Sequence, residues 1–149
     1  MAKKISIIIC EPNTPPRVET VEEKLETWQE ITGGIIDVIY PHDDDSCIIL
    51  NDEGKIINLP MNRPLRDELG NPYDVICGTF AIVRAPQDSD TFESLTDEQI
   101  ARYMKQYADY LTEEETESLG EMAQPHMSFV PIDINRGAIV SGLPWWLID

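Results

Sequence analysis

Ile5-Ser6-Ile7-Ile8-Ile9-Cys10 is an apolar run in which four of the six residues are isoleucine. β-Branched side chains in a run of this length are typical of a buried β-strand. The run is far shorter than the roughly 20 residues that cross a bilayer. Glu11 follows it where a signal peptide would need small residues. Similar apolar runs at residues 35–40 and 75–83 are predicted to be further strands of the same sheet.

A helix is predicted between the first two of these strands. Residues 11–17 contain three prolines, which indicates a loop. Thr20 and Glu23 have the spacing of a capping box, so the helix is predicted over residues 20–32. Gly33-Gly34 is predicted to end the helix, because glycine adopts the left-handed conformation of a C-terminal cap at little cost.

A β-hairpin is predicted between the second and third apolar runs. Residues 47–50 and 55–58 are its expected strands, joined by the turn Asn51-Asp52-Glu53-Gly54. Residues 59–72 contain three prolines and are predicted to be irregular. Gly78, inside the third run, indicates a β-bulge or a close approach of two backbones.

Helical patterns return towards the C-terminus. Thr96 and Gln99 form a capping box, and so do Thr112 and Glu115, which predicts a second helix and a short third helix. The second helix carries an apolar stripe formed by Ile100, Tyr103, Met104, Tyr107 and Leu111.

These patterns predict an α+β fold, in which a mostly antiparallel sheet of four or five strands packs against one helix. An acidic helical segment and a short extended tail follow. We therefore expect a core domain over residues 1–87. Residues 88–149 are expected to form an acidic helical extension and an apolar C-terminal tail, packed on the core.

The charge of the chain is its strongest functional signal. The 28 acidic residues outnumber the 11 basic residues, which gives a net charge of −17. Solubility needs only about 2–8 charges on a small domain. Residues 85–128 alone carry a net charge of −9. Such a field repels phosphates, so direct binding of nucleic acid is not expected and a basic protein surface is the favoured partner.

Motifs of catalysis, cofactor binding and metal binding are not found in the sequence. Cys10, Cys47 and Cys77 lie in strand-like runs without metal-ligand spacing, and they are expected to be buried thiols in a reducing cytoplasm. Neither His42 nor His126 belongs to a triad signature, and no phosphate-binding glycine loop is present. The acidic turn His42-Asp43-Asp44-Asp45 fails the calcium-loop template, which needs glycine at its sixth position. No enzyme activity, cofactor or metal is predicted.

The order of several short motifs resembles one family. These motifs are Gly33-Gly34-Ile35-Ile36-Asp37-Val38, Asn51-Asp52-Glu53-Gly54-Lys55, Leu59-Pro60-Met61-Asn62-Arg63 and Gly70-Asn71-Pro72-Tyr73-Asp74-Val75-Ile76-Cys77-Gly78-Thr79-Phe80. Together they resemble the domain of unknown function numbered 3846, over roughly residues 3–84, with residues 95–107 as a continuation. The resemblance implies a phage or plasmid protein in the cytoplasm of a bacterial host. Small accessory proteins of this kind often inhibit host defence, and the family supplies no catalytic residues.

An acidic helical face is the first candidate site. A folded row of carboxylates can imitate the phosphates of duplex DNA, which carries one charge per roughly 1.7 Å of its axis. We therefore expect a non-enzymatic inhibitor of anti-restriction or anti-CRISPR type that binds a nucleic-acid-handling enzyme. The alternative is an ordinary solvated helix face. The residues concerned are Asp97, Glu98, Asp109, Glu113, Glu114, Glu115, Glu117 and Glu121.

An arginine-containing loop is the second candidate. Asn62, Arg63, Arg66 and Tyr73 are positioned in the sequence to form a pocket for a phosphorylated or nucleotide ligand, with Arg63 as the bidentate partner. The alternative is that Arg63 and Asp74 brace an irregular loop through hydrogen bonds to the backbone. Finally, Trp145 and Trp146 in the apolar tail are expected either to pack on the sheet or to form an oligomer or partner contact.

Overall fold

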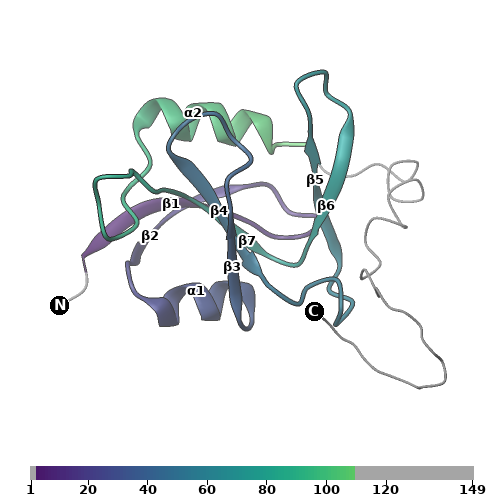
Figure 1. Cartoon of the computed structure of the whole chain (residues 1–149), viewed down its shortest axis with the longest axis horizontal. Coiled ribbons are helices and arrows are strands. Elements are labelled where there is room, and N and C mark those ends of the chain that lie inside the picture. The colour runs from purple at the N-terminus through teal and green to yellow at the C-terminus, as the bar shows by residue number, and fades with distance from the viewer. Residues whose placement is uncertain (1–2, 110–149) are drawn as a thin grey trace.

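The computed structural model describes residues 3–109, and one five-stranded antiparallel sheet lies at its centre (Figure 1). The order of strands across the sheet is β2-β1-β7-β4-β3. These strands are β1 (Lys4–Cys10), β2 (Arg17–Glu22), β3 (Ile36–Ile39), β4 (Ser46–Asn51) and β7 (Phe80–Arg84).

A two-stranded antiparallel ribbon and two helices complete the described part. The ribbon consists of β5 (Met61–Arg66) and β6 (Pro72–Cys77). The helices are α1 (Leu25–Thr32) and α2 (Asp97–Gln106). The predicted α+β class with a mainly antiparallel sheet is therefore confirmed. Within the described residues, neither helix is long and apolar enough to cross a membrane.

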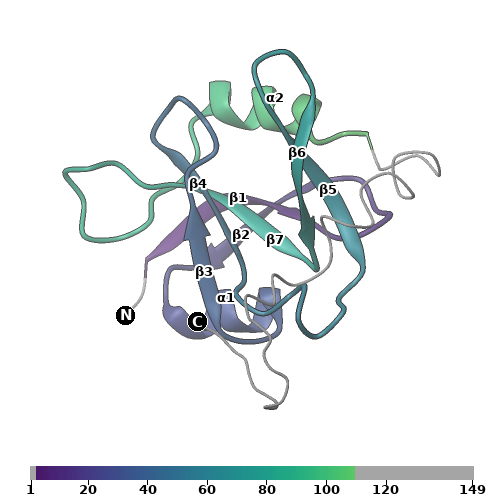
Figure 2. The same ribbon diagram turned by 45° about the vertical axis from the view of Figure 1, so that its right-hand side comes forward.

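Both faces of the sheet are covered, and this explains why the inner strand β1 is almost continuously apolar. Ile7 and Ile9 of β1 pack on one side with Trp28 of α1. Ile8 and Cys10 point to the other side, where α2 and the ribbon lie. Figures 1 and 2 show the two helices on opposite sides of the sheet. Burial of each such isoleucine contributes about 1.5–3 kcal/mol relative to exposure.

The start of the first helix differs from the prediction. Thr20 lies in strand β2, Glu23 directly follows that strand, and the helix begins only at Leu25. Residues of β2 pair with β1 at six positions, from Lys4 opposite Glu22 to Ile9 opposite Arg17. The hydrogen bonds of this ladder pair more backbone groups than a capping box would. Pairing with β1 therefore outweighs the tendency of Thr20 and Glu23 to begin a helix. The helix ends as predicted, because Gly33 adopts a φ of 85° at the C-terminal cap.

The middle of the chain also differs from the prediction. Residues 55–58 form turns rather than a strand, and the segment predicted to be irregular contains β5. The predicted strand 75–83 is two strands, β6 and β7, which belong to different sheets. Gly78 separates them with a φ of 92°. The prediction was wrong because it took the prolines as evidence against a strand. A two-stranded ribbon has two open edges, where the missing N–H of proline is tolerated.

Helix α2 follows its sequence signal closely. The Thr96 hydroxyl accepts a hydrogen bond from the Gln99 N–H at 3.1 Å, and the Gln99 side chain accepts one from the Thr96 N–H at 3.0 Å. Tyr103 and Tyr107 are buried with Leu95 in the core cluster on this side of the sheet. The predicted capping box at Thr112 and the extended tail with Trp145 and Trp146 lie outside the described residues. The predicted division at residue 87 stays a prediction.

Alanine substitution at Gly78 is expected to lower the free energy of unfolding more than the same change at Gly70. Both glycines have positive φ, which costs an L-residue about 1–2 kcal/mol. A Cβ at Gly78 would lie 2.6 Å from Leu59 Cδ1, whereas nothing lies within 4 Å at Gly70. Urea unfolding of both variants measures the difference. Equal losses would show that Leu59 moves aside without cost.

Candidate functional site

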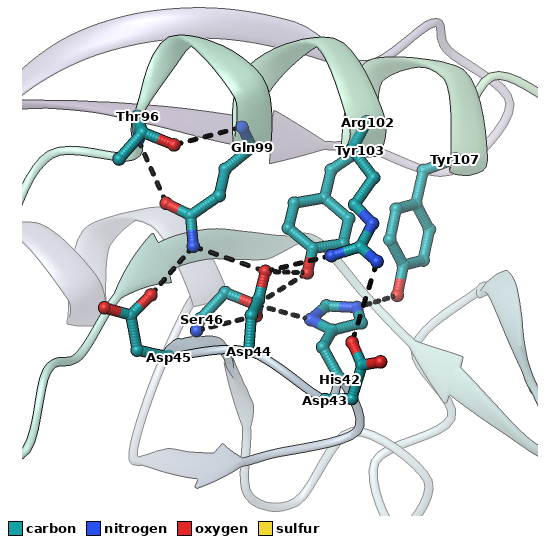
Figure 3. Close-up of polar contacts among 10 residues, drawn as sticks. All are labelled: His42, Asp43, Asp44, Asp45, Ser46, Thr96, Gln99, Arg102, Tyr103 and Tyr107. Atoms are coloured by element: carbon teal, nitrogen blue, oxygen red, sulfur yellow. Dashed lines mark hydrogen bonds and ion pairs between the residues drawn. The ribbon is translucent and has the colours of Figure 1, made fainter.

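A polar cluster joins the turn between β3 and β4 to helix α2 (Figure 3). The turn supplies His42, Asp43, Asp44 and Asp45, and Ser46 begins β4. Residues on one face of α2 meet them, because positions three and four apart share a helix face. We call this set the turn–helix cluster. Its members on α2 are Gln99, Arg102 and Tyr103, and Tyr107 is the C-terminal cap of that helix.

The Asp44 carboxylate is the centre of the turn–helix cluster. It accepts hydrogen bonds from the Ser46 N–H at 2.9 Å, the Ser46 hydroxyl at 2.5 Å and the Tyr103 hydroxyl at 2.5 Å. Gln99 and Arg102 approach its second oxygen at 3.3 and 3.4 Å. Burial acts to raise the pKa of Asp44, but the hydrogen bonds from Ser46, Tyr103 and Gln99 outweigh it and hold that pKa far below its usual value. The Asp44 carboxyl is therefore ionised throughout the physiological pH range.

His42 extends the network with both ring nitrogens. Nδ1 lies 2.8 Å from the Ser46 hydroxyl, and Nε2 lies 2.8 Å from the Tyr107 hydroxyl. Burial lowers the pKa of His42, so the ring is neutral at pH 7. Because Ser46 donates its only proton to Asp44, Nδ1 must donate to Ser46 and Nε2 must accept from Tyr107. One arrangement of protons therefore satisfies every member of the chain from Tyr107 to Asp44.

The order of groups in this cluster differs from that of a catalytic triad. In a catalytic triad the histidine lies between the carboxylate and the nucleophile, whereas here Ser46 lies between His42 and Asp44. Ser46 is also fully buried. Burial raises the pKa of the Cys10 and Cys47 thiols to about 12, so neither forms a thiolate near neutral pH. Among residues 3–109, no group of three or more histidines, cysteines and acids is arranged to hold a metal ion.

Arg63 and Asn62 lie in the interior, where they hold the ribbon to the rest of the protein. The Arg63 guanidinium donates to three backbone carbonyls: Glu11 at 3.1 Å, Thr14 at 2.7 Å and Tyr107 at 2.9 Å. Asn62 accepts from Arg63 at 2.6 Å and donates to the carbonyls of Cys10 and Gly78, each at 2.9 Å. Only 1% of Arg63 is exposed.

These contacts agree with the alternative in which Arg63 braces a loop through backbone carbonyls. Asp74 does not share that role, because its carboxylate accepts from Lys55 at 2.5 Å and from its own neighbour's N–H, that of Val75, at 2.8 Å.

Arg66 and Tyr73 are exposed, so the four residues of the predicted pocket do not converge. Arg66 donates to the Gly70 carbonyl at 3.2 Å, across the turn of the ribbon. It lines a cavity of about 120 Å³ with Arg63, His42 and Tyr107, but neither Asn62 nor Tyr73 lines that cavity.

A second, more open groove of about 430 Å³ is lined by Arg66 and Arg102. The acids Asp43, Asp67 and Glu68 line it as well. Charges of both signs therefore meet there, which does not select an anion.

The acidic face is described only in part. Asp97 and Glu98 are exposed in the first turn of α2, where the helix dipole favours negative charge. Asp109 is exposed at the end of the described chain, near the cavity that Arg63 lines. The remaining members lie outside the described residues: Glu113, Glu114, Glu115, Glu117 and Glu121.

Sequence reasoning missed the turn–helix cluster. It treated Tyr103 and Tyr107 as part of an apolar stripe, and it considered the acidic turn as a calcium loop, which it rejected. One local signal was available, because an Asp two residues before a Ser often binds the backbone and side chain of that Ser in an Asx turn. The partners on α2 lie more than 50 residues away in the sequence, so no local pattern identifies them.

Arg63→Met is expected to reduce the free energy of unfolding by about 3–5 kcal/mol, because buried oxygens lose a charged donor. Arg63→Lys should have a smaller effect, since one ammonium cannot reach all the acceptors of the guanidinium fork. The control is Arg66→Met, which removes the same charge from an exposed position of the same strand and should change stability by about 0.5 kcal/mol or less. Urea unfolding measures all three. A wild-type midpoint for Arg63→Met would contradict the bracing role.

The stability of the wild type should fall between pH 7.5 and pH 5 more steeply than that of His42→Gln. Burial lowers the pKa of His42 in the folded protein. As the pH falls, His42 is therefore protonated first in the unfolded chain, below about pH 6.5. His42 therefore contributes its full stability above that pH. The contribution is lost as the pH falls through the folded pKa, by at most about 1.4 kcal/mol per pH unit.

Urea unfolding at several pH values measures both slopes, and His126→Gln separates the effect of the other histidine. Parallel slopes for wild type and His42→Gln would be inconsistent with a neutral, buried His42.

Comparison with known proteins gives a family and no activity. Neither the curated proteins nor the solved structures contain a match to this chain. The family described as "Domain of unknown function (DUF3846)" matches residues 5–108, which include the ribbon, both helices and all of the sheet except Lys4. The match includes the continuation of the resemblance into α2. With the match covering more than half of its length, the chain belongs to the DUF3846 family.

Proposed function

We propose that this chain is a non-enzymatic binding protein that presents carboxylates to a basic surface of a protein partner. The observation that carries the proposal is the distribution of charge. Residues 1–109 contain 21 acids and 10 bases, a net charge of −11. Many of the bases are neutralised by neighbouring acids. Ion pairs hold Lys3, Arg17, Lys24, Lys55, Arg84 and Arg102.

The fold supports this proposal because it holds exposed carboxylates on rigid elements. Helix α2 is anchored by its capping box and by the buried rings of Tyr103 and Tyr107. Its exposed Asp97 and Glu98 therefore have fixed positions relative to the sheet. Preformed charge of this kind raises the rate of association with an oppositely charged surface by about 10- to 1,000-fold.

The partner we propose is a nucleic-acid-handling defence enzyme of a bacterial host. A basic channel that accepts a polyanion also accepts a folded row of carboxylates, so the protein would act as a mimic of nucleic acid and inhibit the enzyme. The family resemblance, from which we expect a phage or plasmid protein, motivates this choice, and we propose that the protein acts in the bacterial cytoplasm. The buried contacts of Arg63 do not favour the alternative, a binder of a phosphorylated ligand.

Replacement of Glu113, Glu114, Glu115 and Glu117 by glutamine should slow association with the partner about tenfold at low salt. The four substitutions keep side-chain size and remove four charges. The matched control, Glu26→Gln/Glu30→Gln/Asp52→Asn/Glu53→Gln, removes four exposed charges from α1 and the turn after β4. Partners captured from a bacterial lysate would be identified by mass spectrometry, and their association rates measured at about 50 and 300 mM salt.

Equal slowing of both variants would show that only net charge matters, which contradicts a specific acidic face. Direct retention of duplex DNA in a gel shift would contradict the mimicry proposal as a whole, because the same negative field would have to attract phosphates.

A further inference from the structure

A groove of about 420 Å³ opens at one end of the five-stranded sheet. We call it the Tyr40 groove. Its walls include Glu23, Tyr40, Pro86, Ser89, Asp90 and Phe92. A groove of this size is in the range that holds a side chain or small ligand.

The topology of the sheet explains why these distant residues meet. Strands β2, β7 and β3 run in the same direction, because antiparallel β1 and β4 separate them. Their C-terminal ends therefore lie at the same end of the sheet. Glu23 follows β2, Ala85 follows β7, and Tyr40 follows β3.

The loop after β7 is held in place before any partner binds. Glu93 and Arg84 exchange backbone hydrogen bonds of 2.8 and 3.2 Å. The Glu93 carboxylate accepts from Lys3 Nζ at 2.6 Å and from the Ser89 hydroxyl at 2.6 Å. Phe92 packs edge-on against Trp28 of α1, with 5.6 Å between ring centroids. A preformed groove loses less entropy on binding than a flexible loop does.

The chemistry of the walls selects a cation. Glu23 and Asp90 are the charged residues that line the groove, and both are acids. The groove beside α2, in contrast, contains Arg66 and Arg102. Tyr40 is 67% exposed, so its ring face is accessible to a ligand. An exposed aromatic ring beside carboxylates is a favourable surface for a guanidinium, through cation–π and charge attraction together.

We propose that the Tyr40 groove receives an arginine side chain of the partner protein. The inference rests on the proposed function in one respect, namely that the partner surface is basic. It adds a specific contact to an interaction otherwise governed by long-range charge. Tyrosine and arginine are the residue types enriched among the few interface contacts that dominate affinity.

The first test is an NMR titration of the whole ¹⁵N-labelled chain with acetyl-Gly-Arg-Gly-amide. A peptide with citrulline in place of arginine is the control, because citrulline has nearly the same shape and no charge. The expected result is that shifts concentrate at Tyr40 and residues 86–92, and that the citrulline peptide binds about tenfold more weakly. The proposal would be overturned by shifts elsewhere or by equal binding of the two peptides. It would also be overturned if about 20 mM peptide, the concentration that detects a binding free energy of about −2 kcal/mol, caused no shifts.

The second test uses matched variants. Tyr40→Leu should weaken binding of the arginine peptide about fivefold or more, whereas Tyr40→Phe, which keeps the ring, should bind as the wild type does. Tyr73→Leu removes a ring of similar exposure, 53%, from the ribbon and should have no effect. An unchanged dispersion of amide signals verifies the fold of each variant. Full binding by Tyr40→Leu would overturn the role of the ring.

The peptide assay needs no partner from the cell, so its outcome is separate from that of the proposed function. Binding of the peptide with no inhibition of any defence enzyme would reject the function and keep the groove. Inhibition that survives Tyr40→Leu, with no peptide binding, would reject the groove and keep the function.

Discussion

The buried guanidinium of Arg63 is the interaction on which the arrangement of the layers depends. Its three carbonyl acceptors belong to the loop after β1, at Glu11 and Thr14, and to the end of α2, at Tyr107. One side chain of the ribbon therefore fixes the position of a loop and a helix at once. A charged group buried to this extent is stable only when its donors are satisfied, so the three elements must stay together.

The position of α2 determines the turn–helix cluster and, through it, the Tyr40 groove. The Asp44 carboxylate binds both Ser46 and Tyr103, so the turn between β3 and β4 has one conformation relative to the helix. Tyr40 precedes that turn directly. The polar network around Asp44 thus has a structural role: it holds an exposed aromatic ring at one end of the sheet. Full satisfaction of every donor and acceptor is what makes such a network rigid.

Burial of the sheet on both faces explains where the excess negative charge lies. The inner strands β1, β7 and β4 offer no open face and contain no acid, so the acids occupy the edge strands, the helices and the turns. Asp37 of the edge strand β3 lies near Asp52 and Glu53, and burial together with the charges of Asp37 and Glu53 raises the pKa of Asp52. Exposed charge on an edge strand also discourages pairing with another chain. The same distribution leaves carboxylates available to a basic partner.

The sequence alone determined the features that depend on neighbours in the chain. The apolar run from Ile5, the capping box at Thr96 and the helix end at Gly33 were predicted correctly, because their causes are local hydrogen bonds and side-chain patterns. The net charge follows from composition. Tertiary structure decided the rest. Thr20 lies in a strand because β1 offers a ladder of hydrogen bonds, and Arg63 is buried because its acceptors come from residues 44–52 positions away. Partners so distant leave no pattern in the sequence, since only the fold brings them within hydrogen-bonding distance.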